Sequence, residues 1–426
     1  MVERRYETLG ETVYEETLSN GLRILVNKRR DYEKKFAFFA TRYGGLDMRF
    51  RYGGAWRETP AGVAHFLEHK LFETEEGNTL QIMSEQGADP NAFTSFDLTG
   101  YFFQCTEKFE ENLRLLLSFV SKPYFTPESV AKEQGIIGQE IAMGEDEAHS
   151  EVFYDLLGCL YHGHPIRTHI AGTAASIAQI TPEVLYLCHD AFYAPSNMVL
   201  TVVGDVDPER VIQIAREIVT ALGKEPPERD HGPEEPDEPV RKENRRTMAV
   251  SAPLFQLGFK LPPAPGGREG LRAQIVGDLA GDILMGDASP LYARLYDDGL
   301  LTREFSYGYE RYPGAAFFVA GGESRDPQAV KEAVLEEAAR IAREGIDPAR
   351  FRRVKRAAYG SAVNGLNSFE ETAIDMAESC LQGCGYFDFP ELYREITVQE
   401  VERFIAEGFA ESRAALAVIL PGGEEK

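Results

Sequence analysis

The sequence predicts an α+β fold made of two homologous domains, each an antiparallel sheet covered by helices. Three observations lead to this prediction. The chain has 426 residues, which is typical of two domains of about 200 residues each. Residues 223–246 combine five prolines and dense charge with few apolar side chains, a composition typical of a linker. The blocks on either side, residues 1–222 and 247–426, repeat one order of elements, which indicates a duplicated unit.

Turn and strand signals are clear in the first block. Asn20-Gly21 is a hairpin-turn signal directly before the apolar run at residues 22–26. Residues 36–41 and 102–104 are rich in aromatic and other apolar side chains and are predicted strands. Helical spacing of apolar residues predicts four helices, over residues 60–72, 112–121, 128–144 and 150–160. Antiparallel strands covered by helices make an α+β layer.

The two blocks end in the same way. In the first, a helical pattern over residues 181–192 leads into an apolar strand over residues 198–203. In the second, a helical pattern over residues 397–409 leads into a strand over residues 414–420. Further back, Thr126-Pro127 and Asp347-Pro348 begin long helices at comparable places.

Composition excludes several classes of protein. The 69 acidic residues outnumber the 45 Lys and Arg, and the net charge of −24 opposes binding to nucleic acid or to anionic membrane surfaces. The apolar runs are too short for a signal peptide or a membrane span. Five cysteines are a sparse and odd set, which favours free thiols in a reducing compartment. We therefore expect a cytoplasmic protein with no nucleic-acid or membrane partner.

The chemistry-bearing motif is AGVAHFLEHKLF at residues 61–72. On a helix, His65 and His69 lie four positions apart and share one face, and Glu68 is close to that face. Two neutral imidazoles bind zinc well, zinc lowers the pKa of a bound water to about 7, and a nearby carboxylate can take the proton. His-x-x-Glu-His is a known inverted zinc-peptidase order. The alternative is a pair of core histidines with no metal.

A zinc site needs a third protein ligand. The helix predicted from residue 128 carries Glu133 and Glu140 seven positions apart, two turns along one face, among apolar Ile136, Ile137 and Ile141. Carboxylates on a largely buried face need a partner, so this helix is the candidate source of the third ligand. The alternative for Glu133 is the ordinary state of a glutamate, exposed to water.

Five segments of the first block resemble the pitrilysin-type zinc peptidases, a family that includes insulin-degrading enzyme and the mitochondrial processing peptidase. They are HFLEHKLFE at residues 65–73, GADPNAFTSFD at 87–97, KEQGIIGQE at 132–140, SEVFYDLL at 150–157 and HPIRTHIAG at 164–172. The resemblance implies one Zn²⁺ per chain. Its ligands would be His65, His69 and Glu140, with Glu68 as the general base and Glu133 as the carboxylate that orients a ligand histidine.

The same resemblance implies how substrate is held. Asn91, Ala92 and Phe93 would lie in an edge strand to which a peptide adds by main-chain hydrogen bonds; for Asn91 the alternative is a plain turn residue. The family also has two homologous domains that face each other across a chamber, in agreement with the duplication. In the second half, Val354 and Ser361 stand opposite Glu133 and Glu140, so we expect a degenerate copy without metal ligands.

One departure from the family bears on partners. Active single-chain members carry an Arg and a Tyr that bind the substrate carbonyl and the oxyanion. In the equivalent stretch, residues 289–309, Tyr296 stands at the arginine position, and Arg303 and Tyr309 are out of register. The chain in this respect resembles the YmfH-type bacterial branch, in which a metal-bearing subunit pairs with a homologous sister that lacks the zinc motif. The expected partners are a peptide substrate and such a sister subunit, in a heterodimer, or else a second copy of this chain.

The function predicted from these residues is zinc-dependent hydrolysis of peptides or short unfolded segments by an endopeptidase or peptidase subunit. Two alternatives are a non-catalytic peptide-binding or assembly subunit and a zinc hydrolase of small non-peptide amides. Two other clusters carry weaker signals: His162, His164 and His169 fit a proline-containing loop better than a second metal site, and Cys380 and Cys384 fit free thiols.

Overall fold

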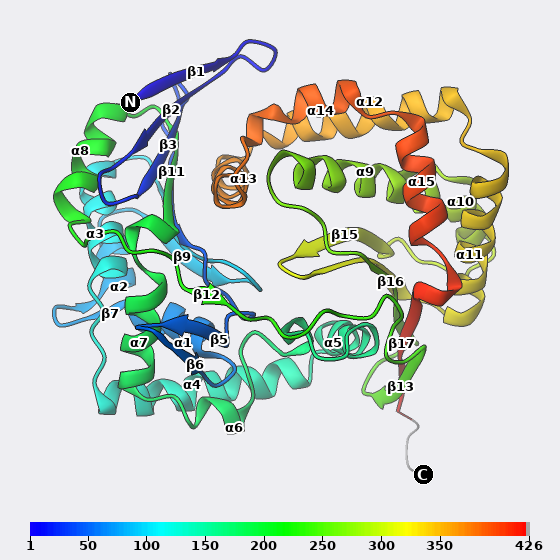
Figure 1. Cartoon of the computed structure of the whole chain (residues 1–426), viewed down its shortest axis with the longest axis horizontal. Helices are drawn as coiled ribbons and strands as arrows, with labels where there is room; N and C mark the ends of the chain where they lie inside the picture. Colours follow the sequence, from blue (N-terminus) through cyan, green and yellow to red (C-terminus); the bar gives the residue numbers. More distant parts are fainter. Residues whose placement is uncertain (423–426) are drawn as a thin grey trace. The chain divides into compact units, whose positions relative to one another are not determined.

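The computed structural model describes residues 1–422 and divides the chain into two compact units (Figure 1). Unit 1 comprises Met1–Ile141, Thr168–His231 and Ala362–Asp388. Unit 2 comprises Ala142–Arg167, Gly232–Ser361 and the chain from Phe389 on. Each unit contains one large sheet with helices packed on it, so the expected α+β class is confirmed.

The sheet of unit 1 has seven strands in the order β1-β2-β3-β11-β4-β10-β9. Their bounds are β1 (Val2–Tyr6), β2 (Glu11–Thr17), β3 (Arg23–Lys28), β4 (Lys35–Thr41), β9 (Asp89–Thr94), β10 (Thr99–Cys105) and β11 (Met198–Gly204). All neighbours are antiparallel except β3 and β11. This parallel pair departs from the purely antiparallel sheet that we expected, and it forms because β11 returns to the sheet after a long helical connection.

The centre of this sheet is covered on both faces. β11, MVLTVVG, is buried along its whole length, as expected for an apolar run of β-branched residues inside a sheet. Leu200 and Val202 belong to the main core of unit 1. Thr201 points to the opposite face, where its hydroxyl donates to the carbonyl of Ala373 at 2.8 Å.

Eight helices belong wholly or mainly to unit 1. They are α1 (Val63–Leu71), α2 (Thr79–Glu85), α3 (Phe109–Ser121), α4 (Pro127–Glu145), α6 (Ala174–Ile177), α7 (Pro182–Phe192), α8 (Pro208–Ile218) and α13 (Phe369–Gln382). Two small sheets complete it: β5 (Arg49–Tyr52), β6 (Ala55–Glu58) and β12 (Glu228–Arg229) form one, and β7 (Glu73–Thr74) with β8 (Gly77–Asn78) the other. The β5–β6 hairpin was not predicted, although its first strand, RFRY, alternates charged and aromatic residues and Gly53-Gly54 marks the turn.

The sheet of unit 2 has five strands in the order β13-β17-β14-β16-β15, and only β13 and β17 are parallel. The strands are β13 (Glu243–Met248), β14 (Leu254–Leu261), β15 (Ser306–Tyr312), β16 (Ala315–Glu323) and β17 (Ala414–Pro421). The helices are α5 (Ala148–Leu160), α9 (Gly267–Met285), α10 (Pro290–Asp297), α11 (Pro327–Glu344), α12 (Pro348–Gly365), α14 (Phe389–Glu395) and α15 (Val398–Gly408).

Both units contain short 3₁₀ turns. In unit 1 they are η2 (Pro195–Asn197) and η3 (Tyr386–Asp388), and in unit 2 they are η1 (Pro165–Arg167) and η4 (Glu411–Arg413).

The compact units differ from the two halves of the sequence by one helix each. α5 precedes the predicted linker but packs on β14 and β17, and its cyan-green colour beside red β17 shows this in Figure 1. α13 follows the linker but packs on β4 and β11. Each helix covers a face of the sheet built by the other half. The predicted division at the linker, into residues 1–222 and 247–426, therefore differs from the division into compact units.

The segment predicted as a linker is partly anchored. Glu228–Arg229 forms β12 against β5, and β13 begins at Glu243. Between them, the Glu235 side chain is only 7% exposed and pairs with Lys260 at 2.7 Å. Glu235 is therefore not simply solvated, although it stands in an acidic run, because the buried ammonium group of Lys260 needs a carboxylate partner.

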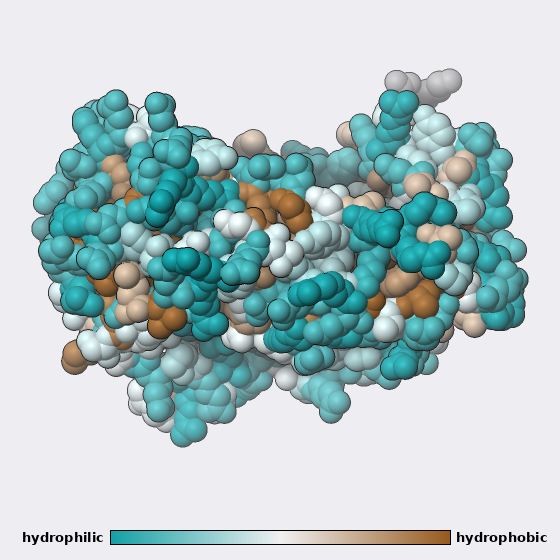
Figure 2. All heavy atoms as spheres, turned by 90° about the horizontal axis from the view of Figure 1, so that it is seen from above, coloured by the Kyte–Doolittle hydropathy of each residue, from teal (hydrophilic) through white to brown (hydrophobic). Residues whose placement is uncertain are grey.

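One face of the molecule can be described by its hydropathy. On the face seen in Figure 2, hydrophilic residues predominate and hydrophobic residues appear in small separate areas. Within residues 1–422, no helix has the length and apolar character needed to cross a membrane.

Candidate metal centre

Helix α1 places both histidines and Glu68 at one site. Val63, Phe66, Leu67 and Leu71 are buried and fix the helix on the core. The helix starts after Gly62, whose φ is 97° and where a Cβ atom would lie 2.6 Å from the carbonyl oxygen of Ala171. Only glycine suits this backbone conformation and this close approach. The start of the motif helix is thus fixed by packing.

The two imidazoles and one carboxylate converge. The His65 and His69 rings are 4.6 Å apart at their centroids and inclined by 61°. His65 Nε2 lies 3.5 Å from Glu140 Oε1, and His69 Nε2 lies 3.5 Å from Glu140 Oε2. One ligand atom from each residue falls within 4.8 Å of the others, and no other such group of His, Cys, Asp or Glu occurs in residues 1–422.

These distances suit a zinc ion. Tetrahedral zinc with bonds of about 2.0–2.1 Å holds its ligand atoms about 3.4 Å apart, close to the observed 3.5 Å between each imidazole nitrogen and Glu140. The donor set, two imidazoles and one carboxylate, is a known catalytic zinc set. His65 Nδ1 is buried and hydrogen-bonds with no described residue.

Glu133 and Glu140 come from α4 but differ in environment. Glu133 is buried, and its Oε1 lies 3.1 Å from His69 Nδ1. This contact places a proton on Nδ1 and leaves Nε2 free as a ligand. The Glu140 side chain is 50% exposed. The expectation that both carboxylates lie on a largely buried helix face is therefore confirmed for Glu133 and wrong for Glu140. Glu140 is open because it faces the histidines across the site.

The charges of the site shift two pKa values. Burial lowers the pKa of His69, but the hydrogen bond to Glu133 and the charges of Glu68 and Glu140 outweigh it and raise that pKa overall. The hydrogen bond with His65 lowers the pKa of Glu140 against the effect of burial. Both shifts show that carboxylates surround the two imidazoles, an environment that favours a cation.

Glu68 is anchored by a residue that sequence reasoning missed. Glu68 as a whole residue is 9% exposed, and the Thr94 hydroxyl donates to its Oε2 at 2.7 Å. Thr94 is the last residue of β9, so this bond joins the motif helix to the edge strand. The signal was present in the segment NAFT, where Thr94 stands next to the residues expected to bind substrate.

Asn91, Ala92 and Phe93 lie in β9, an edge strand of the sheet of unit 1. β9 pairs with β10 on one side, with Ala92 opposite Tyr101; in the described chain no strand pairs with its other side. The Phe93 ring stacks on Phe38 at 5.8 Å. Asn91 Oδ1 accepts from its neighbour's backbone N–H at 2.9 Å. Asn91 therefore lies within a strand and is not a plain turn residue.

The remaining candidates lie elsewhere in the fold. Val354 and Ser361 are on α12, Tyr296 is an exposed residue of α10, and Tyr309 is a buried residue of β15. Buried His164 lies in a loop with its Nε2 2.9 Å from the carbonyl oxygen of Pro313. Within the described residues, His162, His164 and His169 do not form a cluster of metal-ligand atoms.

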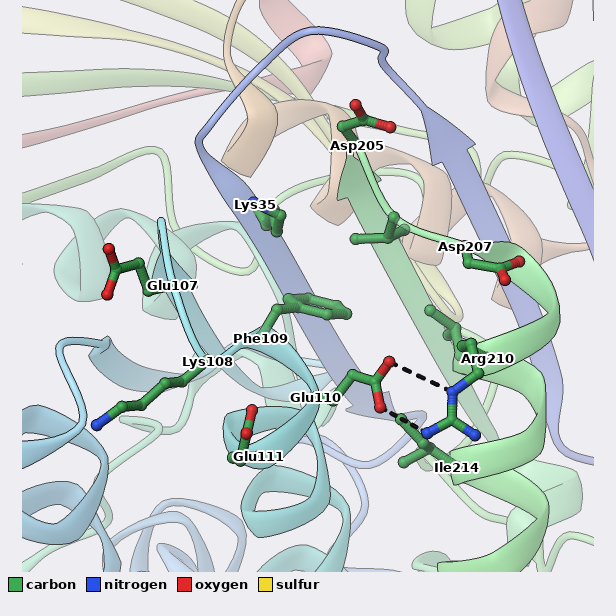
Figure 3. A pocket seen from close by; sticks show the side chains of 12 residues that line it. Lys35, Glu107, Lys108, Phe109, Glu110, Glu111, Asp205, Asp207, Arg210 and Ile214 are labelled. Carbon is green, nitrogen blue, oxygen red and sulfur yellow. Dashed lines mark hydrogen bonds and ion pairs between the residues drawn. The ribbon is translucent and has the colours of Figure 1, made fainter.

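A pocket of about 500 Å³ in unit 1 does not involve the metal-site residues (Figure 3). It lies where α3 and α8 begin, and its lining includes the ion pair of Arg210 with Glu110 at 2.6 Å. Lys35 at its rim donates to two backbone carbonyls. These charges have partners within the protein, so the pocket adds nothing to the candidate site.

The fold and site together define a class. A duplicated α+β unit with His-x-x-Glu-His on a helix of the first copy is typical of inverted zinc peptidases. Residues 52–174 match the family model described as insulinase, peptidase family M16, and residues 179–358 match the model of the peptidase M16 inactive domain. The two models together cover most of the chain. The chain belongs to peptidase family M16.

Individual relatives agree with this assignment. The zinc protease YmfH of Bacillus subtilis is 37% identical over 428 residues, which cover 98% of each chain. A structure of an M16-like protein from Alicyclobacillus acidocaldarius is 32% identical, with a TM-score of 0.94 over 99% of this chain and 100% of that one. Pitrilysin, 14% identical with a TM-score of 0.77, shares the fold over 98% of this chain, which spans 46% of pitrilysin.

Proposed function

We propose that the protein is a zinc metalloendopeptidase, or the metal-bearing subunit of one, that hydrolyses peptides or short unfolded segments. The convergence of His65, His69 and Glu140 within 4.8 Å carries the proposal. These three residues would hold one zinc ion. Relatives named zinc proteases, YmfH among them, support the peptidase class. A cytoplasmic location is part of the proposal and fits the sparse, odd set of five cysteines.

Each residue of the site would have a separate role in hydrolysis. A bound zinc ion would lower the pKa of a water molecule and polarise the substrate carbonyl. Glu68 would take a proton from the attacking water and pass it to the leaving amine. Thr94 occupies Oε2 of Glu68, which leaves Oε1 for the proton. Glu133 holds the His69 ring by its Nδ1.

Substrate would bind to the free side of β9. An unpaired strand edge offers backbone N–H and C=O groups in a row, and an extended peptide can complete the ladder. Asn91, Ala92 and Phe93 would supply these groups, and the contact from Thr94 to Glu68 connects the strand with the general base. An extended peptide would thus be held directly beside the residues that cut it.

A homologous sister subunit without the zinc motif, or a second copy of this chain, would complete the transition-state contacts. The family's carbonyl-binding Arg is replaced by Tyr296, which is 41% exposed on α10. Tyr309 is 5% exposed and packs into unit 2, so it is poorly placed to contact substrate. The proposal therefore includes donors supplied by a partner.

Zinc content and hydrolysis test the proposal together. We expect about one zinc per purified chain, and cleavage of quenched fluorescent peptides that rises when a sister subunit is added. Glu68→Gln should keep zinc and lose hydrolysis by a factor of about 10²–10⁴. Retained hydrolysis in this variant, with the partner present, would exclude Glu68 as the base.

A second candidate is a non-catalytic peptide-binding or assembly subunit. The observation that favours it is the match of residues 179–358 to a domain described as inactive, together with Tyr296 at the arginine position. Purified protein without zinc, inert with every sister tested but still able to bind peptides, would favour this second function.

A further inference from the structure

Lys70 is a fully buried lysine beside the metal-site residues. It follows His69 in α1, and its side chain is 0% exposed. Lysine is almost never fully buried unless it is paired, because removing an ammonium group from water costs several kcal/mol. A methionine or leucine would fill the same space without this cost. The charge at this position therefore needs an explanation.

Lys70 contacts two carboxylates. Its Nζ pairs with Glu73, three positions further along the chain, and lies 3.9 Å from Oε2 of Glu133. The other oxygen of Glu133, Oε1, lies 3.1 Å from Nδ1 of His69. Glu133 thus bridges Lys70 and the histidine, with one carboxylate oxygen directed at each.

Glu133 depends on this cation. Its side chain is 8% exposed, and a buried carboxylate is costly unless opposite charge and hydrogen bonds compensate it. His69 offers one hydrogen bond, and Lys70 offers the positive charge. Without the ammonium group, the carboxylate would be drawn toward water, and the His69 ring would lose the partner that orients it.

The pair also joins two helices. Lys70 belongs to α1, which carries His65 and His69, and Glu133 belongs to α4, which carries Glu140. An ion pair between these helices bears on the position of all three ligand atoms. Glu73 is 31% exposed and balances the charge of Lys70 from the other side.

We infer that Lys70 is a positioning residue of the metal centre, which acts through Glu133 to hold His69 and α4 ready for the metal. This inference rests on the proposed zinc site. It concerns affinity for the metal, so it can be tested without activity.

The test is the zinc affinity of Lys70→Met, measured by competition with a chromogenic chelator. Met removes the charge at similar length, and we expect affinity about tenfold weaker, at the lower end of the range for lost partners of ligand histidines. Lys132→Met, at an exposed lysine of α4 next to Glu133, is the matched control and should bind zinc as the wild type does. Circular dichroism verifies that each variant is folded.

A double-mutant cycle with Glu133→Gln separates this role from simple packing. If Lys70 acts through Glu133, Lys70→Met should have no further effect on zinc affinity in the Glu133→Gln background. Unchanged or tighter binding in the single variant, or full additivity in the double variant, overturns the inference. A wild-type chain that binds no zinc instead overturns the proposed function. If Lys70→Met does not fold, Lys70→Gln, which keeps a donor without the charge, is measured with the same expectation.

Discussion

Glu235 should stabilise unit 2 by fixing the predicted linker to it. Its carboxylate accepts hydrogen bonds from the backbone N–H groups of His162, Gly163 and His164 at 2.7 to 3.1 Å, and from Lys260 Nζ at 2.7 Å. Burial alone would raise its pKa, but these donors outweigh burial and lower the pKa from 4.5 to about 2. Glu235→Gln removes the charge and presents an NH₂ group to these donors.

The pKa shift sets the size and the pH range of the effect. A fall from 4.5 to about 2 corresponds to about 3 kcal/mol of stability. Because the pKa is lower in the folded chain, this contribution is complete above pH 4.5 and disappears as the pH falls from 4.5 to 2. Glu235→Gln should therefore destabilise unit 2 by about 3 kcal/mol at pH 7 and by progressively less below pH 4.5.

Hydrogen exchange at the three donor amides is the direct assay, with urea unfolding followed by far-UV circular dichroism. The single tryptophan of the chain, Trp56, lies in unit 1, so its fluorescence reports separately on the other unit and should change little. Glu234→Gln, at an exposed neighbouring position, is the control. An effect no larger than that of the control, or one that is constant from pH 7 to pH 3, would refute the reasoning.

Three further predictions concern the metal site and the core of unit 1. Thr94→Val should lower kcat about tenfold with little change in KM or zinc content, because it removes the hydrogen bond that holds the Glu68 carboxylate. Thr94→Ser keeps the hydroxyl and should restore kcat. A change confined to KM would contradict this role of Thr94. His69→Ala should lose both zinc and hydrolysis, and stoichiometric zinc in that variant would remove His69 from the ligands. His189 is buried, which lowers its pKa from 6.5 to about 4 although its Nε2–H donates to the carbonyl of Val120 at 2.9 Å. Because this pKa is lower in the folded chain, His189 should cost unit 1 about 3 kcal/mol as the pH falls from 6.5 to 4; Trp56 fluorescence during urea unfolding measures this loss, which His189→Gln should reduce.

The elements around the metal site were predictable because their signals are local. Helices α1 and α4 follow from the spacing of apolar residues, and the spacing of His65 and His69 places both rings on one side of one helix. The partner of Glu68 was not predictable in this way. Thr94 is 26 residues away, and only the pairing of β9 with β10 brings its hydroxyl to the motif helix. Lys70 carries no signal at all in the sequence, since a lysine on a helix is ordinarily exposed.

The exchange of α5 and α13 shows a second limit. The composition of residues 223–246 predicts a linker. Composition alone does not predict which sheet a neighbouring helix covers. Both helices have buried apolar residues, and long-range contacts such as that of Thr201 with Ala373 connect α13 with its sheet. Burial of Glu235 also depends on long-range contacts that composition does not show. Glu235 stands in a charged, proline-rich run, yet the fold buries it against three backbone N–H groups.

The cluster of candidate metal ligands occurs once in the described residues, and unit 2 has no counterpart of it. In unit 2, α9 follows β14 directly and packs on β15. Gly277 and Gly281 of α9 lie against Tyr309 and Tyr307, where added Cβ atoms would stand 2.5 Å and 2.7 Å from the tyrosine rings. Here tyrosine side chains of β15 fill the space next to the helix, so neither position can carry a larger side chain. The contact between α9 and β15 thus serves packing in unit 2, while in unit 1 Thr94 of the edge strand β9 donates a hydrogen bond to Glu68 of α1.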